Sequence, residues 1–361
     1  MYKLSLSGGM SCPNRDGLID NRGCIFCSAG GSGDFTGAAI SKCADIDIQI
    51  NTAKALVSKK YSGSDYIAYF QSYTNTYADV NYLRELFFNV IKRPEIKILS
   101  IATRPDCLDD NIIKLLAELN SIKPVWIELG LQTIHENTAN YIRRGYCLDV
   151  FEDAVYRLNS IGIKPIVHMI IGLPNETESM MLDTARFISH CNIAGVKLQL
   201  LHILKNTDLA EEYFNGSVDI LSLTQYIEIL GKIIKILPPD CVIHRLTGDG
   251  PKNLLIAPLW SSNKKNVINT INKYFKDNIV YINVMKNMSV DCDCCAVAED
   301  PCMDDIGILI STDPIAIDQA CIDLVYASND KGRDHLIERI ESRNGVHTIE
   351  AAAKLGYGSR E

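Results

Sequence analysis

Short apolar runs alternate over roughly the first two hundred residues with stretches in which apolar residues recur every three or four positions. The runs have the length and composition of buried strands, which we expect over residues 2–7, 66–70, 97–102, 125–131, 164–171 and 196–203. The stretches between them have the spacing of amphipathic helices, which we expect over residues 46–61, 80–91, 109–121 and 176–190. Six strands that alternate with helices predict an α/β fold with a parallel sheet.

The pattern changes twice after the sixth expected strand. Residues 206–277 have helical spacing around a single strand at 242–246. Residues 279–361 are expected to form a further small α+β segment. The chain is therefore expected to have three parts, which are residues 1–205, 206–277 and 279–361.

Polar side chains follow several of the expected strands, at the end where a parallel sheet gathers its functional groups. Gln71 and Ser72 follow the second strand. Glu128 and Gln132 are four residues apart in the fourth strand, so their side chains point to the same face of the sheet. A carboxylate inside such a sheet needs a partner. The alternative for the Gln71 segment is an ordinary polar turn.

Three polar residues interrupt otherwise apolar strands: His168, Lys197 and Gln199. Either they line a cavity or they are hydrogen-bonded core residues, and we favour the cavity. Arg104 follows the third strand in Thr-Arg-Pro-Asp. Asn175, with Glu178 three residues later, is expected to cap the helix that follows the fifth strand.

Composition and charge narrow the class of protein. The 361 residues are 47% hydrophobic and 22% charged, as in ordinary globular proteins, and the net charge of −8 argues against a surface that coats nucleic acid. The start of the chain has no apolar signal segment, and no apolar run reaches the eighteen or so residues of a membrane span. The 13 cysteines are therefore expected to be reduced or metal-bound, in a cytoplasmic protein without membrane association.

Three cysteines near the start carry the strongest chemical signal. Cys12, Cys24 and Cys27 have the spacing C-x11-C-x2-C within sixteen residues. Three thiolates suit an iron–sulfur cluster or zinc. In a [4Fe–4S] cluster they leave one iron without a protein ligand. A structural zinc site wants four ligands, and Cys43 is the only nearby candidate for a fourth, since the first histidine is His135.

The segment Cys-Pro-Asn-Arg-Asp-Gly, followed by Gly-Cys-Ile-Phe-Cys with Phe26 just before the last cysteine, resembles the radical SAM signature. Its long first gap is similar to that of a bacterial subgroup related to the elongator catalytic subunit. The resemblance implies a partial six-unit (β/α) TIM-like barrel over residues 1–205 and a small C-terminal extension over 206–277. It also implies a truncated start, because members of the subgroup usually have a further N-terminal segment.

The resemblance further implies the cofactors and the reaction. A [4Fe–4S] cluster bound by Cys12, Cys24 and Cys27 would bind S-adenosylmethionine (SAM) through its open iron. An electron from flavodoxin or ferredoxin would then cleave SAM to a 5′-deoxyadenosyl radical, which abstracts hydrogen from an unknown substrate. RNA is a candidate substrate because of the relationship to the elongator subunit, although the negative net charge of the chain argues against RNA. The alternative from another class is a non-catalytic iron–sulfur protein for electron transfer or sensing.

The same resemblance points to residues that contact SAM. Gly-Leu-Gln and Arg-Arg-Gly are similar to SAM-contacting segments of the oxygen-independent coproporphyrinogen oxidase branch, and an arginine fork suits the methionyl carboxylate. Relatives have a glutamate two residues before Arg104, where this chain has Ala102. The residues expected to bind the cofactors, besides the three cysteines, are Phe26, Gln71, Ser72, Glu128, Gln132, Arg144 and Gly172.

The last segment, residues 279–361, resembles only the C-terminal end of a domain of unknown function found beside ferredoxin-type iron–sulfur centres. A natural fusion and an artefact of gene assembly would both produce such a fragment. It contains four cysteines that are candidates for a second metal site: Cys292, Cys294, Cys295 and Cys302. Within it, Thr312 or Asp313 is expected to cap a helix with Pro314 in its first turn.

Overall fold

The computed structural model describes residues 1–31, 45–58, 63–248, 250–275, 279–290 and 299–360. The chain divides into two compact units. The first comprises Met1–Leu56 and Gly63–Val267, and the second is made mainly of Ile268–Glu361.

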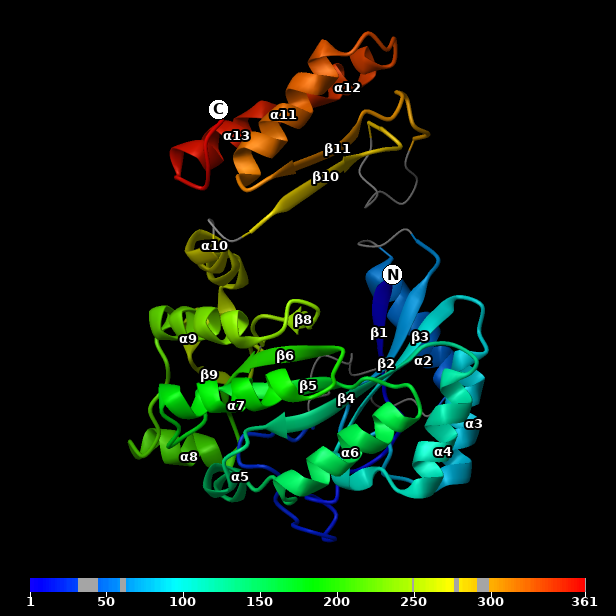
Figure 1. Ribbon diagram of the computed structural model, residues 1–361, viewed down its shortest axis with the longest axis vertical. Coiled ribbons are helices and arrows are strands. Elements are labelled where there is room, and N and C mark those ends of the chain that lie inside the picture. Colours follow the sequence, from blue (N-terminus) through cyan, green and yellow to red (C-terminus); the bar gives the residue numbers. More distant parts are fainter. Residues whose placement is uncertain (32–44, 59–62, 249, 276–278, 291–298, 361) are drawn as a thin grey trace. The chain divides into compact units, whose positions relative to one another are not determined.

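A curved parallel sheet forms the centre of the first unit (Figure 1). Its strands follow the order β1-β2-β3-β4-β5-β6-β8, and every neighbouring pair is parallel. The bounds are β1 Tyr2–Leu6, β2 Tyr66–Phe70, β3 Ile96–Thr103, β4 Val125–Gln132, β5 Ile166–Ile171, β6 Gly195–Leu200 and β8 Val242–Arg245. The predicted parallel sheet and the predicted α/β partial barrel are thus confirmed, and β8 adds a seventh strand to the sheet.

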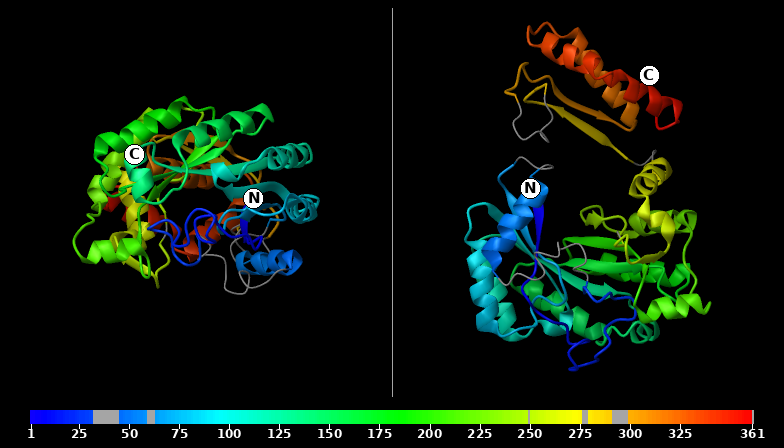
Figure 2. Two further views of the ribbon diagram at one scale, coloured as in Figure 1. Left: turned by 90° about the horizontal axis from the view of Figure 1, so that it is seen from below. Right: turned by 180° about the vertical axis from the view of Figure 1, so that it is seen from behind.

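Helices follow the strands and cover the outer face of the sheet, as Figure 2 shows from two further sides. Those of the first unit are α2 Ile46–Val57, α3 Val80–Ile91, α4 Asp110–Asn120, α5 Glu136–Tyr141, α6 Leu148–Ser160, α7 Glu178–His190, α8 Asp208–Phe214 and α9 Leu223–Ile236, and α10 Lys264–Phe275 follows them. Capping side chains fix the first residue of several of these helices. Asp79 and Asp109 accept backbone N–H groups at α3 and α4, and Ser222 and Gln225 form a capping box at α9.

Three details differ from the sequence-based expectations. The sixth predicted strand is two elements, because β6 ends at Leu200 and Ile203–Leu204 is β7, which pairs with β9 Leu255–Ala257. β8, expected in the C-terminal extension, joins the main sheet beside β6. Asn175 does not cap α7: its φ is 64°, and Thr177 accepts the N–H of Met180 in its place. A capping residue needs extended backbone, which Thr177 has.

The second unit contains an antiparallel pair, β10 Tyr281–Met285 and β11 Gly307–Ser311, and the helices α11 Pro314–Ala327, α12 Arg333–Ser342 and α13 Gly345–Lys354. Asp313 accepts two N–H groups at the start of α11, and Pro314 lies in its first turn, as predicted. Met285, Met303, Val325 and Leu336 form a small core. Of the four candidate metal ligands, Cys302 is a half-buried free thiol. Cys292, Cys294 and Cys295 lie outside the described residues.

Among the described helices, none combines the length and the apolar character that crossing a membrane requires.

Candidate functional site

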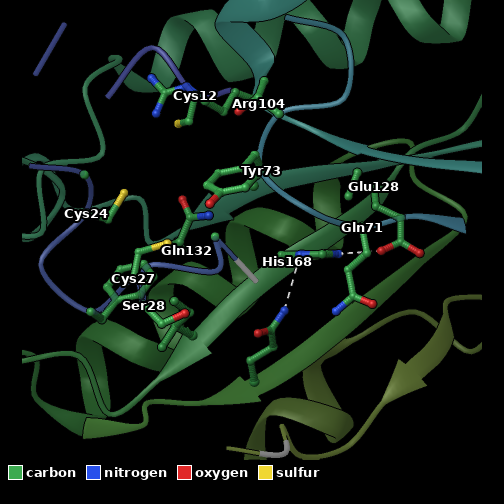
Figure 3. A pocket seen from close by; sticks show the side chains of 18 of the residues that line it. Cys12, Cys24, Cys27, Ser28, Gln71, Tyr73, Arg104, Glu128, Gln132 and His168 are labelled. Atoms are coloured by element: carbon green, nitrogen blue, oxygen red, sulfur yellow. Dashed lines mark hydrogen bonds and ion pairs between the residues drawn. The ribbon is translucent and has the colours of Figure 1, made fainter. Parts of the chain in front are cut away.

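A cavity lies inside the curved sheet and opens at the carboxyl ends of its strands (Figure 3). It brings together residues that are far apart in the sequence, which is what the strand-end clusters predicted. Of the ten predicted site residues, eight line the cavity: Cys12, Cys24, Phe26, Cys27, Gln71, Glu128, Gln132 and Arg144. Ser72 and Gly172 do not line it. His168, Lys197 and Gln199 do line it, and they are also hydrogen-bonded within the protein, so the two alternatives for these three residues do not exclude each other.

The three predicted cluster ligands are free thiols that face this cavity. In Figure 3 Cys24 and Cys27 lie close together, with Cys12 farther away beside Arg104. Within the described part of the chain, no three His, Cys, Asp or Glu side chains converge tightly enough to hold a metal ion. In a [4Fe–4S] cluster each cysteine binds a different iron, so the three sulfurs are spread around the cluster. A zinc ion needs all its ligands bound to the same atom. Three separated thiols that face one cavity therefore fit the cluster better than they fit zinc. Cys43 lies outside the described residues.

The environment of Cys24 also fits a thiolate ligand. Burial, followed by the neighbouring charge of Cys27, raises the pKa of Cys24 to about 12. Such a thiol keeps its proton at neutral pH unless a metal replaces it. The Asn14 amide lies 3.5 Å from the Cys24 sulfur and donates to it. A donor of this kind stabilises a thiolate or a cluster sulfur.

The motif Asn14-Arg15 holds the cysteine loop in shape. The guanidinium of Arg15 donates to the carbonyls of Cys27 and Ser28 at 2.8 and 2.6 Å. The Asn14 amide donates to the carbonyl of Arg143 at 2.6 Å. The loop is thereby tied both to itself and to the segment after α5.

Gly145 lies in the segment after α5 and packs closely against the cysteine loop. Its φ is +82°, and a Cβ there would lie 2.7 Å from Oδ1 of Asn14 and 3.1 Å from Ile19. A side chain at this position therefore has neither a comfortable backbone conformation nor space.

We expect Gly145→Ala to lower the iron content of the reconstituted protein, because the added methyl group displaces Asn14 from the cysteine loop. The measurement is iron per chain after anaerobic reconstitution. Gly216→Ala is the matched control, since Gly216 has φ +80° but nothing within 4 Å of its Cβ position. Equal iron contents in the two variants would contradict the steric argument.

The turn after β2 closes over the cysteine loop from the other side. The Tyr73 hydroxyl donates to the carbonyl of Ala29 at 2.6 Å, and the Tyr73 N–H donates to that of Gly31 at 2.7 Å. The Thr74 N–H donates to the carbonyl of Ser11 at 3.2 Å. Gln71 lines the cavity beside this turn, whereas Ser72 is buried away from it. The turn is thus a support for the cysteine loop as well as a candidate SAM contact.

Arg144 is almost fully buried, at 2% exposure, and its guanidinium is largely occupied by the protein. It donates to the carbonyls of Tyr146, Leu131 and Thr133 at 3.0, 3.2 and 2.6 Å, and it pairs with Glu136 at 3.0 Å. Only one of its five N–H groups has no acceptor among the described residues, so Arg144 has no pair of N–H groups for bidentate hydrogen bonding to a carboxylate in this arrangement. Its main role here is to hold the end of β4 against the loop that follows.

Gln132 lies at the end of β4 with a φ of 62°, and its amide lies near Gly130 and Tyr146. The Tyr146 hydroxyl donates to Oε1 of Gln132 at 3.3 Å and to the carbonyl of Gly130. The ring of Tyr146 is also covered by the guanidinium groups of Arg104 and Arg144, at 5.0 and 4.8 Å from its centre. Tyr146 escaped the sequence analysis because it lies in a loop with no periodic signal.

A buried polar network lies deeper in the cavity and centres on Glu128, whose side chain has no exposure to solvent. Its oxygens lie 3.2 Å from the Lys3 ammonium, 3.1 Å from the Ser100 hydroxyl, 2.9 Å from the Tyr69 hydroxyl and 2.9 Å from Nε2 of His168. Lys197 also pairs with the carboxylate. Each of the first six strands of the sheet supplies one member, in the order Lys3, Tyr69, Ser100, Glu128, His168 and Lys197.

Burial and charge set the protonation of this network. Burial alone would raise the pKa of Glu128, but the His168 hydrogen bond and the charges of Lys197 and Lys3 hold it well below its usual range. Burial lowers the pKa of Lys197 to about 8, although the Glu128 charge opposes this change. Burial and the Lys197 charge lower the pKa of His168. At neutral pH, Glu128 is therefore a carboxylate and Lys197 is protonated, whereas His168 is neutral.

Family comparisons agree with this geometry. The sequence profile of the Radical SAM superfamily matches residues 21–188, and that of the Radical_SAM C-terminal domain matches residues 193–277. The first match covers most of the sheet with its helices, and the second includes β6 and β8.

Individual relatives show the same kinship. The uncharacterised protein YtqA of Bacillus subtilis is 42% identical over 281 residues, which cover 78% of this chain and 86% of YtqA. Elongator complex protein 3 of Mus musculus is 26% identical over 171 residues, which cover 46% of this chain and only 30% of that protein. The structure of an archaeal Elp3, from Methanocaldococcus infernus, has the same fold, with a TM-score of 0.57 at 17% identity over 76% of this chain and 62% of that structure. This chain therefore belongs to the elongator-related subgroup of the radical SAM superfamily, whose members are enzymes that use a [4Fe–4S] cluster and SAM.

Proposed function

We propose that Cys12, Cys24 and Cys27 bind the [4Fe–4S] cluster, and that SAM occupies the cavity between these cysteines and the Glu128 network. The observation that supports this most is that all three thiols face the cavity lined by the predicted SAM contacts Gln71 and Gln132. When bound, the cluster supplies the electron that cleaves SAM to methionine and a 5′-deoxyadenosyl radical. The radical would then abstract hydrogen from a substrate in the same cavity.

The residues around the cofactor positions divide into supports and contacts. Asn14, Arg15 and Arg144 support the loops, because each of them donates to backbone carbonyls of these loops. Gln71 and Gln132 present amide groups to the cavity and are the contacts that we propose for SAM, together with Phe26 beside the cysteines. Glu128 remains a candidate partner of the ribose hydroxyl groups.

We further propose an external electron donor, flavodoxin or ferredoxin, because the reductive cleavage of SAM takes one electron from the cluster, which a reduced protein of this kind can replace. The kinship with elongator complex protein 3 makes RNA a candidate substrate, whereas the net charge of −8 favours a small molecule.

The test of this function is anaerobic reconstitution with iron and sulfide, followed by reduction with dithionite and an assay for 5′-deoxyadenosine. We expect slow SAM cleavage without any added substrate, and a change in the spectrum of the reduced cluster when SAM is added. A cluster that forms fully but neither responds to SAM nor cleaves it would favour the electron-transfer alternative.

A chain cut after Asp277 should keep the iron content and the SAM cleavage of the full chain. The reason is that the two superfamily matches end at residues 188 and 277, and that all three proposed ligands lie in the first unit. Iron and zinc per chain, measured before and after truncation, check this. Loss of about four irons or of one zinc on truncation would instead establish a second site among the C-terminal cysteines.

A further inference from the structure

Arg245 is the last residue of β8, the seventh strand of the sheet, and it is in register with Lys197 of β6. Its half-buried side chain lines the same cavity as the Glu128 network. Its positive charge acts on Tyr69, His168 and Lys197, so the guanidinium faces the same interior.

Arg245 makes no hydrogen bond or ion pair with any residue that the structure describes, although it lies in a cavity where cations are otherwise matched with acceptors. Each of the other four Lys and Arg residues that line the cavity has a protein acceptor. Arg15 donates to carbonyls of the cysteine loop, Arg104 to Asp106, Arg144 to Glu136, and Lys197 to Glu128.

The carboxylate that lines this cavity is already occupied by other donors. Glu128 is the only Asp or Glu among the described residues that line the cavity. It already receives the ammonium groups of Lys3 and Lys197, besides donors from three other side chains. One negative charge therefore faces two positive charges before Arg245 is counted. The interior beside β6 and β8 has an uncompensated positive charge.

We propose that Arg245 binds an anionic group of the substrate, a carboxylate or a phosphate, at the end of the cavity farthest along the sheet from β1. This inference rests on the proposed function, since it names the chemical class of the molecule from which hydrogen is taken. A partly desolvated guanidinium gains most from an acceptor with two oxygens in one plane, which matches its fork of N–H groups. Gln199 and Lys197, on the neighbouring strand β6, line the same part of the cavity.

The test uses the reconstituted holoprotein and two simple probes, inorganic phosphate and succinate, with uncharged succinamide as the blank. Isothermal titration calorimetry at constant ionic strength, without and with saturating SAM, measures the affinity of the protein for each probe. We expect saturable binding of at least one anion, weakened about tenfold to a hundredfold in Arg245→Gln. The preferred probe identifies the class as phosphate or carboxylate. Arg245→Lys, which keeps the charge but loses the fork, should bind with intermediate affinity.

Lys235→Gln is the matched control, because it removes one positive charge from an exposed position on α9. Its anion affinity should equal that of the unchanged protein. Equal affinities in Arg245→Gln and the unchanged protein, or no detectable binding of either anion, would overturn the inference. Competition between SAM and the anion would also overturn it, because Arg245 would then serve the cofactor. Iron content and SAM cleavage of the unchanged protein test the proposed function separately.

Discussion

Replacement of Cys24 by alanine should abolish SAM cleavage and prevent formation of a complete [4Fe–4S] cluster. Each proposed ligand is one of only three, so the cluster has no protein ligand to spare. Burial also disfavours the free thiolate of Cys24, because it raises the pKa of this thiol to about 12. The measurements are iron and sulfide per chain, the spectrum of the reduced protein, and 5′-deoxyadenosine formed from SAM.

Cys147→Ala is the matched control, because Cys147 is an exposed free cysteine just before α6. This variant should keep its full iron content and cleave SAM at the unchanged rate. The cluster assignment would be wrong if Cys24→Ala still assembled four irons per chain and cleaved SAM normally.

Replacement of Glu128 by glutamine should destabilise the first unit by about 3–5 kcal/mol, the usual cost of breaking a buried ion pair by removing one partner. The change leaves Lys197, which is only 4% exposed, without a counter-charge. It also places an amide N–H group among donors that already point at this position. The free energy of unfolding from denaturant titration of the intact chain measures the effect.

Two further variants make this prediction specific. Glu118→Gln breaks an exposed pair with Arg84 and should change the free energy of unfolding much less, because solvent screens that pair. The double variant Glu128→Gln with Lys197→Met should recover part of the lost stability, because the unpaired buried ammonium is then absent as well. If Glu128→Gln costs no more than Glu118→Gln, the network does not stabilise the barrel.

The Glu128 network explains how an open sheet keeps its curvature around a polar interior. The two carboxylate oxygens of Glu128 accept hydrogen bonds from side chains on strands that are up to three positions away from β4 in the sheet. Such a network satisfies its members only when the six strands curve toward one another. Arg245, on the seventh strand, is outside this network and has no partner among the described residues, which is why a substrate anion is proposed there.

Much of the fold was predictable because its signals are local. Apolar runs such as Tyr66–Phe70 and the capping aspartates Asp79 and Asp109 act within a few residues of themselves. The position of β8 was not predictable in this way, because the sheet partner of Val242–Arg245 is β6, more than forty residues earlier. Short apolar runs indicate a strand but not which strand lies beside it.

The amino-acid sequence by itself determined the alternation of strands and helices, the three cysteines at C-x11-C-x2-C, and the strand ends at which polar side chains gather. Only the tertiary structure decided how those polar groups are used. The guanidinium of Arg144 is bound by three backbone carbonyls, and Glu128 is surrounded by donors from five other strands. The physical reason is that hydrogen bonding and desolvation depend on neighbours in space, and a parallel sheet brings those neighbours from distant parts of the chain.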